Sequence, residues 1–115
     1  MLGISGNATE NTESILRAIR DSITRGEQRF TVHAQAQMAV RHVTSTEIIE
    51  ALLSENAEII ENYPDDKYSP SCLIYATTTS GRVLHIHSNH RAVIVTVYEP
   101  NSEEWDDLKR RRISS

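Results

Sequence analysis

Hydrophobic residues recur at helical spacing in the first half of the chain. The first such stripe predicts a helix that starts at a cap on Asn11 or Thr12 and ends before Gly26. The apolar members of this stripe are Ile15, Leu16, Ile19 and Ile23. Another helix, the third along the chain, is expected to begin after Thr44, because Thr44 and Glu47 have the spacing of a capping box.

The second helix is expected to follow a cap at Thr31 and to begin near Val32 or His33. Its apolar stripe predicts the face that packs on the core, with the members Ala36, Ala39, Val40 and Val43. A polar row flanks that stripe at a spacing of four residues, with the members His33, Gln37 and Arg41. Since this row lies where the helix would meet a sheet, we expect it to line a cleft.

From residue 57 onward the pattern changes to strand-like alternation. Four strands are predicted, at residues 57–63, 72–79, 82–88 and 92–99. A last helix is expected over residues 102–112, because acids lie in its first turns and bases at its end. The order predicts an α+β fold, with N-terminal helices followed by a four-stranded antiparallel sheet and a short C-terminal helix. We expect a flexible N-terminus (residues 1–11) and a single domain (residues 12–112).

Alternation along the last two strands sorts their side chains onto two faces. A two-residue turn, Asn89-His90, would place Ser88 opposite Arg91. In that register the apolar face carries Leu84, Ile86, Val93, Val95 and Val97. The other face presents His85, His87, Thr96 and Tyr98. A polar face of this kind is either solvated surface or a site, and the pattern leaves both interpretations open.

Composition and charge narrow the classes of function. The 115 residues suffice for one domain, and the single cysteine, Cys72, excludes an intrachain disulfide. No apolar run approaches the ~20 residues of a membrane span, so we expect a cytoplasmic protein without membrane contact. The net charge of -4 argues against broad, tight binding to nucleic acid. It permits a small local anion site.

The segment HIHSNH is a candidate metal site. His85 and His87 would be two of its ligands, and His90 or Cys72 would be the third. No CxxC or HExxH pattern accompanies them, so we expect no metal and no cofactor, and keep the three histidines as an alternative.

Four segments, in this order, resemble the bacterial family catalogued as domain of unknown function family 4258. They are FTVHAQAQMAVRHV, EIIENYPDD, CLIYATTTSGRVLHI and VIVTVYEP, and the resemblance covers roughly residues 15–112. It implies a fold like that of the RelE-type toxin ribonucleases and of the colicin and EndoU-like nucleases. It also implies metal-independent cleavage of RNA, and as partners RNA and a cognate antitoxin or other protein.

The resemblance also assigns roles to individual residues. The catalytic set is His33, Arg41 and His85, in which the histidines would transfer protons and the arginine would hold the phosphate. The substrate-binding set is Tyr63, Thr96 and Tyr98, to which Arg91 adds a cation at the end of the hairpin. Members of the family often carry an arginine where this chain has Gln37, which weakens the expected anion site. The alternative is a non-catalytic module that binds a protein or a small anion; the oligomeric state is left open.

Overall fold

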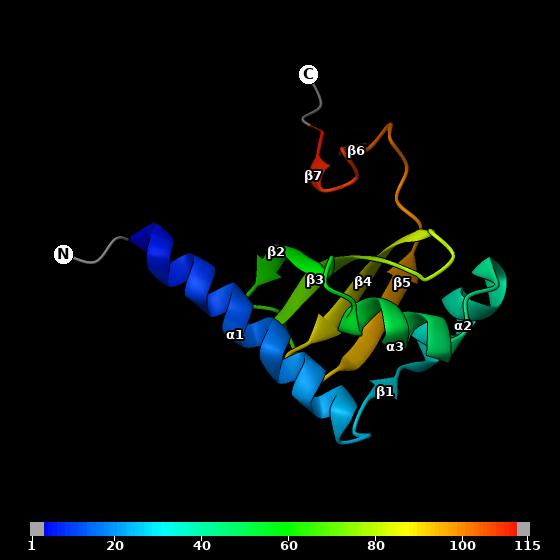
Figure 1. Ribbon diagram of the computed structural model, residues 1–115, viewed down its shortest axis with the longest axis horizontal. Coiled ribbons are helices and arrows are strands. Elements are labelled where there is room, and N and C mark those ends of the chain that lie inside the picture. The colour runs from blue at the N-terminus through cyan, green and yellow to red at the C-terminus, as the bar shows by residue number, and fades with distance from the viewer. Residues whose placement is uncertain (1–3, 113–115) are drawn as a thin grey trace.

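The computed structural model describes residues 4–112, with side chains from residue 11 onward. Three helices and a five-stranded sheet form an α+β fold (Figure 1). The helices are α1 (Ile4–Thr24), α2 (Val32–Arg41) and α3 (Ser45–Leu53). The strands of the sheet are β1 (Arg29–Phe30), β2 (Glu58–Tyr63), β3 (Ser71–Thr77), β4 (Val83–Asn89) and β5 (Val93–Tyr98), and a separate hairpin follows, β6 (Trp105–Asp106) and β7 (Arg110–Arg111). No helix among residues 4–112 is long and apolar enough to cross a membrane.

The first helix is longer than its pattern predicts. Asn11 and Thr12 lie inside α1, which begins at Ile4, so the predicted cap is wrong. The remaining residues of the segment expected to be flexible, 1–3, lie outside the described part. The predicted stop at Gly26 is confirmed, because this glycine adopts a left-handed φ of 74°. The backbone N–H groups of Gly26 and Glu27 then bond back to carbonyls of the last helical turn, which closes the helix.

The sheet has one strand more than expected. Its order is β1-β5-β4-β3-β2, and the four long strands form the predicted antiparallel meander. The additional strand, β1, has two residues and pairs in parallel with β5. Such a short strand shows no alternation, so the sequence pattern could not reveal it.

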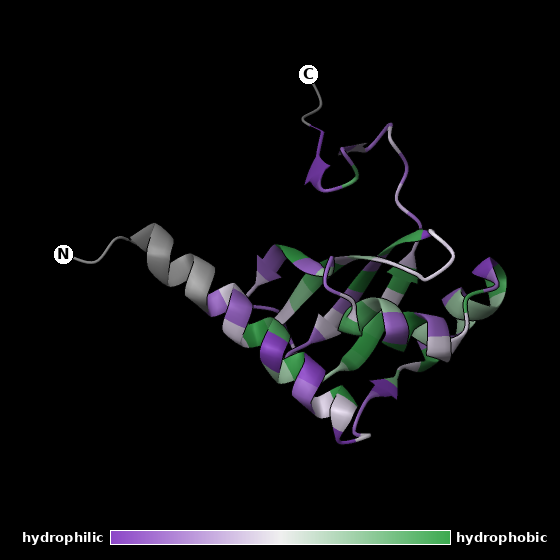
Figure 2. Ribbon diagram, in the orientation of Figure 1, coloured by the Kyte–Doolittle hydropathy of each residue, from purple (hydrophilic) through white to green (hydrophobic). Residues whose placement is uncertain are grey.

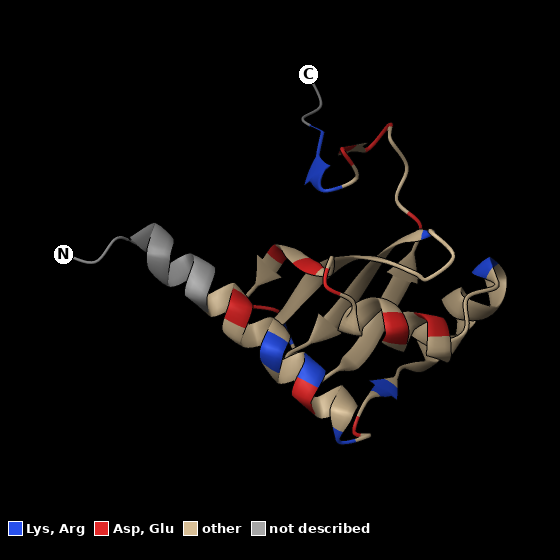
Figure 3. Ribbon diagram, viewed as in Figure 1, with Lys and Arg blue, Asp and Glu red and all other residues tan. Residues whose placement is uncertain are grey.

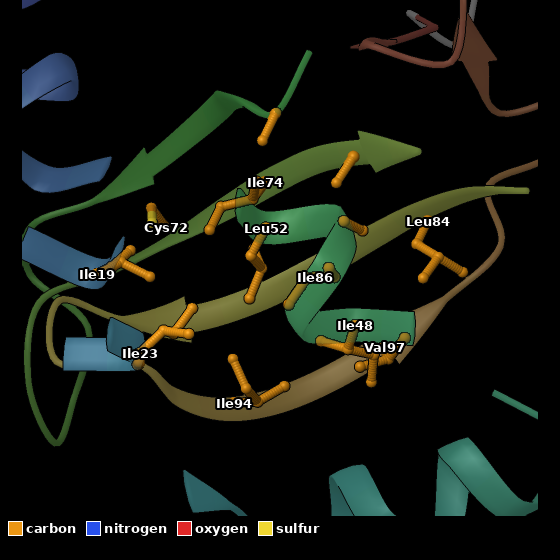
Figure 4. Close-up of a cluster of buried hydrophobic side chains, with 14 of the residues drawn as sticks. Ile19, Ile23, Ile48, Leu52, Cys72, Ile74, Leu84, Ile86, Ile94 and Val97 are labelled. Carbon is orange, nitrogen blue, oxygen red and sulfur yellow. The ribbon is translucent and has the colours of Figure 1, made fainter. Parts of the chain in front are cut away.

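One face of the sheet and the helices α1 and α3 enclose the core (Figures 1 and 4). Ile19, Ile48 and Ile86 are fully buried there. Figure 2 shows hydrophobic residues concentrated in this layer, whereas the C-terminal hairpin is mostly hydrophilic.

A bulge in β5 overturns part of the predicted core. The pairing changes from His87–Thr96 to Ser88–Ile94, which leaves Val95 as an extra residue. The bulge reverses the alternation, so Ile94 joins Val97 in the core, and Val93 and Val95 are only half-buried.

The packing of α2 also differs from its prediction. Ala34 is buried against the sheet, whereas the predicted stripe of Ala36, Ala39 and Val40 faces solvent, and only Val43 of that stripe is buried. The cause lies at the predicted cap, Thr31. Its hydroxyl accepts the N–H of Ala34 and donates to the carbonyl of Val95 at the bulge, 3.2 Å away. This double contact fixes which side of α2 meets β5.

The predicted C-terminal helix is wrong, because residues 105–111 form the β6–β7 hairpin. Two bases that would have lain along this helix pair instead with acids on β2. Lys109 pairs with Glu58 at 2.8 Å, and Arg111 pairs with Glu61 at 2.8 Å. Tertiary contacts therefore override the local preference. We call residues 101–112 the C-terminal arm.

The predicted capping box at the start of α3 is confirmed. The Thr44 hydroxyl accepts the N–H of Glu47, and the Glu47 carboxylate accepts the N–H of Thr44. We expect Thr44→Ala to lower the free energy of unfolding by about 1 kcal/mol, since it leaves helix donors unpaired. Urea titration should show this loss, with the exposed helix residue Thr46→Ala as control. Equal stabilities of the two variants would contradict the assignment.

Candidate functional site

The second face of the sheet carries the polar residues that the alternation predicts. His85 lies opposite Tyr98, and His87 lies opposite Thr96. The predicted grouping of these four side chains is therefore confirmed, although the two-residue turn is not. Ala92 adopts a left-handed φ of 65° and the turn is longer, with Ser88 opposite Ile94 instead of Arg91.

His85 is fully buried at the centre of this face. Its Nε2 lies 2.5 Å from the carbonyl of Leu108, and its Nδ1 lies 3.1 Å from the hydroxyl of Tyr98. A carbonyl can only accept, so Nε2 carries the proton of the neutral ring, and Tyr98 donates its hydroxyl proton to Nδ1. Trp105 covers the ring edge-on, at 4.4 Å between centroids.

Burial sets the protonation states of this pair. It lowers the pKa of His85, an effect that the hydrogen bond to the Leu108 carbonyl partly offsets. Burial also raises the pKa of Tyr98. At neutral pH the imidazole is therefore uncharged and the phenol keeps its proton, so a proton acceptor lies directly behind the Tyr98 hydroxyl.

Tyr98 opens onto a cleft of about 550 Å³ between α2, the end of β5 and the C-terminal arm. The lining residues that matter for its chemistry are Arg41, Thr96, Tyr98, Glu104 and Arg111. The cleft thus lies where the polar row of α2 meets the sheet, as the sequence predicts. Of the residues expected in a site, Arg41, Thr96 and Tyr98 share this cleft, and His85 lies directly behind Tyr98.

Two arginines, Arg41 and Arg111, line the cleft. Arg41 donates from Nε to Gln37 at 3.2 Å and has no carboxylate partner among the described residues. Arg111 pairs with Glu61 and lies over the ring of Trp105, 4.6 Å from its centroid. The hydrogen bond that Arg111 donates to the Glu61 carboxylate raises the pKa of Arg111 far above its usual value. The Arg111 guanidinium therefore stays charged at any physiological pH.

Ion pairs hold the C-terminal arm against the sheet. Besides the contact of Arg111, Lys109 pairs with Glu58 and lies 4.7 Å from the ring centroid of Tyr75. Figure 3 shows the basic residues of β7 gathered in this arm. The arm thus supplies one wall of the cleft, its second arginine and the carbonyl that fixes the tautomer of His85.

Three of the predicted site residues lie outside the cleft. His33 is exposed in the first turn of α2 and does not line it. The hydroxyl of Tyr63 donates to the Glu61 carboxylate, and burial raises the pKa of Tyr63 to about 12. Arg91 lines a separate hollow beside the end of α1, together with His90.

The alternative metal site finds no support in the described residues. His85 uses Nε2 on the Leu108 carbonyl, and His87 uses Nε2 on Ser71, 2.7 Å away. Within residues 4–112, no group of three or more His, Cys, Asp or Glu side chains is arranged to hold a metal ion. Cys72 is buried in the core, and burial raises the pKa of its thiol to about 12.

Sequence reasoning missed the contributions of the C-terminal arm. Arg111 and Trp105 fall within the predicted C-terminal helix, and nothing in their spacing indicates the contact of Trp105 with His85 or the place of Arg111 in the cleft. Two bases of the run Lys109–Arg112, Lys109 and Arg111, pair with acids on β2. Arg112 pairs with Asp106 inside the arm.

Comparison with known proteins gives a family match. The model described as "Domain of unknown function (DUF4258)" matches residues 30–99. This range runs from β1 to the end of β5, so it includes Arg41, His85 and Tyr98 and stops before the C-terminal arm. No curated protein and no solved structure matches the chain.

Proposed function

We propose that this chain, which belongs to the DUF4258 family, binds single-stranded RNA in the cleft and cleaves its backbone without a metal ion. One observation carries the proposal: Tyr98, a residue that lines the cleft, is hydrogen-bonded through its hydroxyl to a buried and uncharged imidazole, His85. A hydroxyl in this setting can pass a proton from a ligand to the ring behind it.

The hydrogen bond between Tyr98 and His85 defines the direction in which a proton would move, from a ligand to Tyr98 and from Tyr98 to His85. When a ligand hydroxyl bonds to the Tyr98 oxygen, its proton passes to that oxygen while the phenol proton moves to Nδ1 of His85. The resulting imidazolium keeps its second hydrogen bond, from Nε2 to the Leu108 carbonyl. The carbonyl thus holds the ring in the required tautomer, as the third member of a catalytic triad does. His85 acts through Tyr98 and is a positioning and proton-storing residue.

RNA is the substrate class that suits such a base. Its 2′-hydroxyl is an internal nucleophile that lies beside the phosphodiester to be broken, so cleavage needs no metal-activated water. The two arginines of the cleft, Arg41 and Arg111, provide the cations that a phosphate requires. A cleft of about 550 Å³ is within the usual range for small-ligand sites, so we expect it to hold a short stretch of the strand.

The charges also predict that binding is modest. Glu99 is neutralised by Arg82 at 3.1 Å, but Glu104 keeps its carboxylate on the lining of the cleft. Gln37 adds no cation. With a net charge of -4, long-range attraction of a polyanion is absent. The RelE-like relationship and a protein partner such as an antitoxin stay predictions.

We expect Arg41→Gln to raise KM for a short RNA about 10-fold or more, since it removes a charge-assisted phosphate contact. The loss should shrink as salt is added, because the contact is electrostatic. Steady-state cleavage of a fluorescent oligoribonucleotide measures both effects. Arg25→Gln, an exposed arginine that pairs with Glu27 outside the cleft, is the matched control. The same KM in the two variants would remove Arg41 from the site.

A further inference from the structure

A second ordered histidine lies on the polar face and plays no part in the Tyr98–His85 pair. His87 is held by two partners at the start of β3 and in the loop before it. Its Nε2 lies 2.7 Å from the hydroxyl of Ser71 and 3.5 Å from a carboxylate oxygen of Asp66. Ser71 is itself buried and lies 2.5 Å from the same Asp66 oxygen.

The protons of this group can be assigned from its partners. Bonds from the Ser71 hydroxyl and the Lys67 N–H lower the pKa of Asp66, so its carboxylate is ionised and accepts the Ser71 proton. The Ser71 oxygen then accepts, and Nε2 of His87 donates to it. Nδ1 has no hydrogen-bond partner among the described residues, and 24% of the side chain is exposed. In the protonated ring, Nδ1–H is thus free to meet a ligand while Nε2–H faces the carboxylate.

The sheet places His87 next to a residue of the cleft. His87 does not itself line the cleft, but it is the direct cross-strand partner of Thr96, which does. Directly opposed side chains on one face of an antiparallel pair are neighbours, about 4.5–5.5 Å apart at Cβ. Tyr98 lies two residues further along the same strand and on the same face. Thr96 therefore has His87 of β4 as one neighbour and Tyr98 of its own strand, β5, as another.

We propose that His87 is the general acid of the reaction and that Asp66 and Ser71 are the residues that position it. This inference rests on the proposed function, because it completes the cleavage step for which Tyr98 supplies the base. It takes a side chain that the sequence offered only as a metal ligand and gives it a proton-transfer role.

The step balances without any further reactant. The 2′-oxygen forms a bond to phosphorus as its proton passes to Tyr98 and the phenol proton passes to His85. The bond between phosphorus and the 5′-oxygen breaks, and that oxygen takes the proton from Nδ1 of His87. The products are a 2′,3′-cyclic phosphate and a 5′-hydroxyl. Exchange with water then removes a proton from His85 and returns one to His87.

A substrate with a 5′-bridging sulfur tests the role of His87, because a thiolate leaves without being protonated. We expect His87→Gln to lower kcat on ordinary RNA by about 10²–10⁴-fold, the usual contribution of a general acid. On the sulfur substrate the same variant should work within a few-fold of the wild type. Asp66→Asn should give a smaller loss that the sulfur substrate also rescues. His42→Asn, at the exposed end of α2, is the control.

Two outcomes would overturn the inference. Either His87→Gln keeps full activity on ordinary RNA, or it loses the same activity on both substrates, as a merely misfolded protein would. If in either case Tyr98→Phe abolishes cleavage, the proposed function stands and only the role of His87 falls. If the wild-type protein cleaves neither substrate, the proposed function itself fails.

Discussion

Tyr98→Phe is expected to lower kcat for RNA cleavage by about 10²–10⁴-fold, which is what a general base usually contributes. The change removes only the hydroxyl that bonds to His85, from a residue that lines the cleft. Phenylalanine keeps the ring and the packing, so KM should stay within a few-fold of the wild type. Rate measurements under saturating RNA separate the two constants.

Stability provides the control for that variant. Loss of a single hydrogen bond should lower the free energy of unfolding by only about 1 kcal/mol, so the variant remains folded. Tyr68→Phe removes a hydroxyl from a tyrosine that is 88% exposed, and it should leave kcat unchanged. A Tyr98→Phe protein that is folded and fully active would exclude the proposed proton path.

His85→Ala is expected to lower the free energy of unfolding by about 2–5 kcal/mol, the range for a buried side chain that leaves a cavity and unpaired polar groups. The ring is fully buried, and its removal strands the Leu108 carbonyl and the Tyr98 hydroxyl. The C-terminal arm also loses the surface on which Trp105 packs. Urea unfolding measures the loss, and a change below about 1 kcal/mol would contradict this packing.

The same variant should change the response of stability to pH. Burial lowers the pKa of His85 in the fold, so below about pH 6.5 the unfolded chain binds a proton that the folded chain does not. Wild-type stability is therefore complete above that pH and falls as the pH decreases toward 5. His90, whose pKa burial also lowers, acts in the same direction in both proteins. The difference between wild type and His85→Ala in the slope of the free energy of unfolding against pH therefore reports on His85 alone. Identical slopes would contradict the neutral state of His85.

Much of the fold follows from local patterns that tertiary contacts reinforce. The caps Thr31 and Thr44 start α2 and α3 where the sequence predicts, because each side chain satisfies helix donors in its own first turn. The meander follows from alternation and turn residues. Before the bulge, the register of β4 with β5 also places His85 and His87 opposite Tyr98 and Thr96 as predicted, since a shift by one residue would have put the histidines on the core face.

The predictions fail where a contact between residues far apart in the sequence selects one of several conformations that the local sequence permits equally. Both sides of α2 carry small apolar residues, so its pattern does not reveal whether Ala34 or Ala36 faces the sheet. The bond of Thr31 to the Val95 carbonyl makes that choice. The bulge at Val95 depends on the turn after Asn89, whose side chain accepts the N–H groups of Arg91 and Val93.

The candidate site divides in the same way. Pairing on one sheet brings His85, Thr96 and Tyr98 together, and such neighbours can be predicted from strand register. Arg111 and the Leu108 carbonyl reach the site from the C-terminal arm, whose position depends on ion pairs with β2 across about 50 residues of sequence. Local sequence patterns do not reveal such long-range ion pairs, so the part of the cleft that the C-terminal arm supplies could not be predicted.

The most direct test of the account is incubation of the wild-type protein with a single-stranded oligoribonucleotide and with its deoxyribose counterpart, each with excess chelator. The account predicts that only the RNA is cleaved, that chelator has no effect, and that the products end in a 2′,3′-cyclic phosphate and a 5′-hydroxyl. Intact RNA, cleavage of the DNA, or activity that the chelator removes would contradict it.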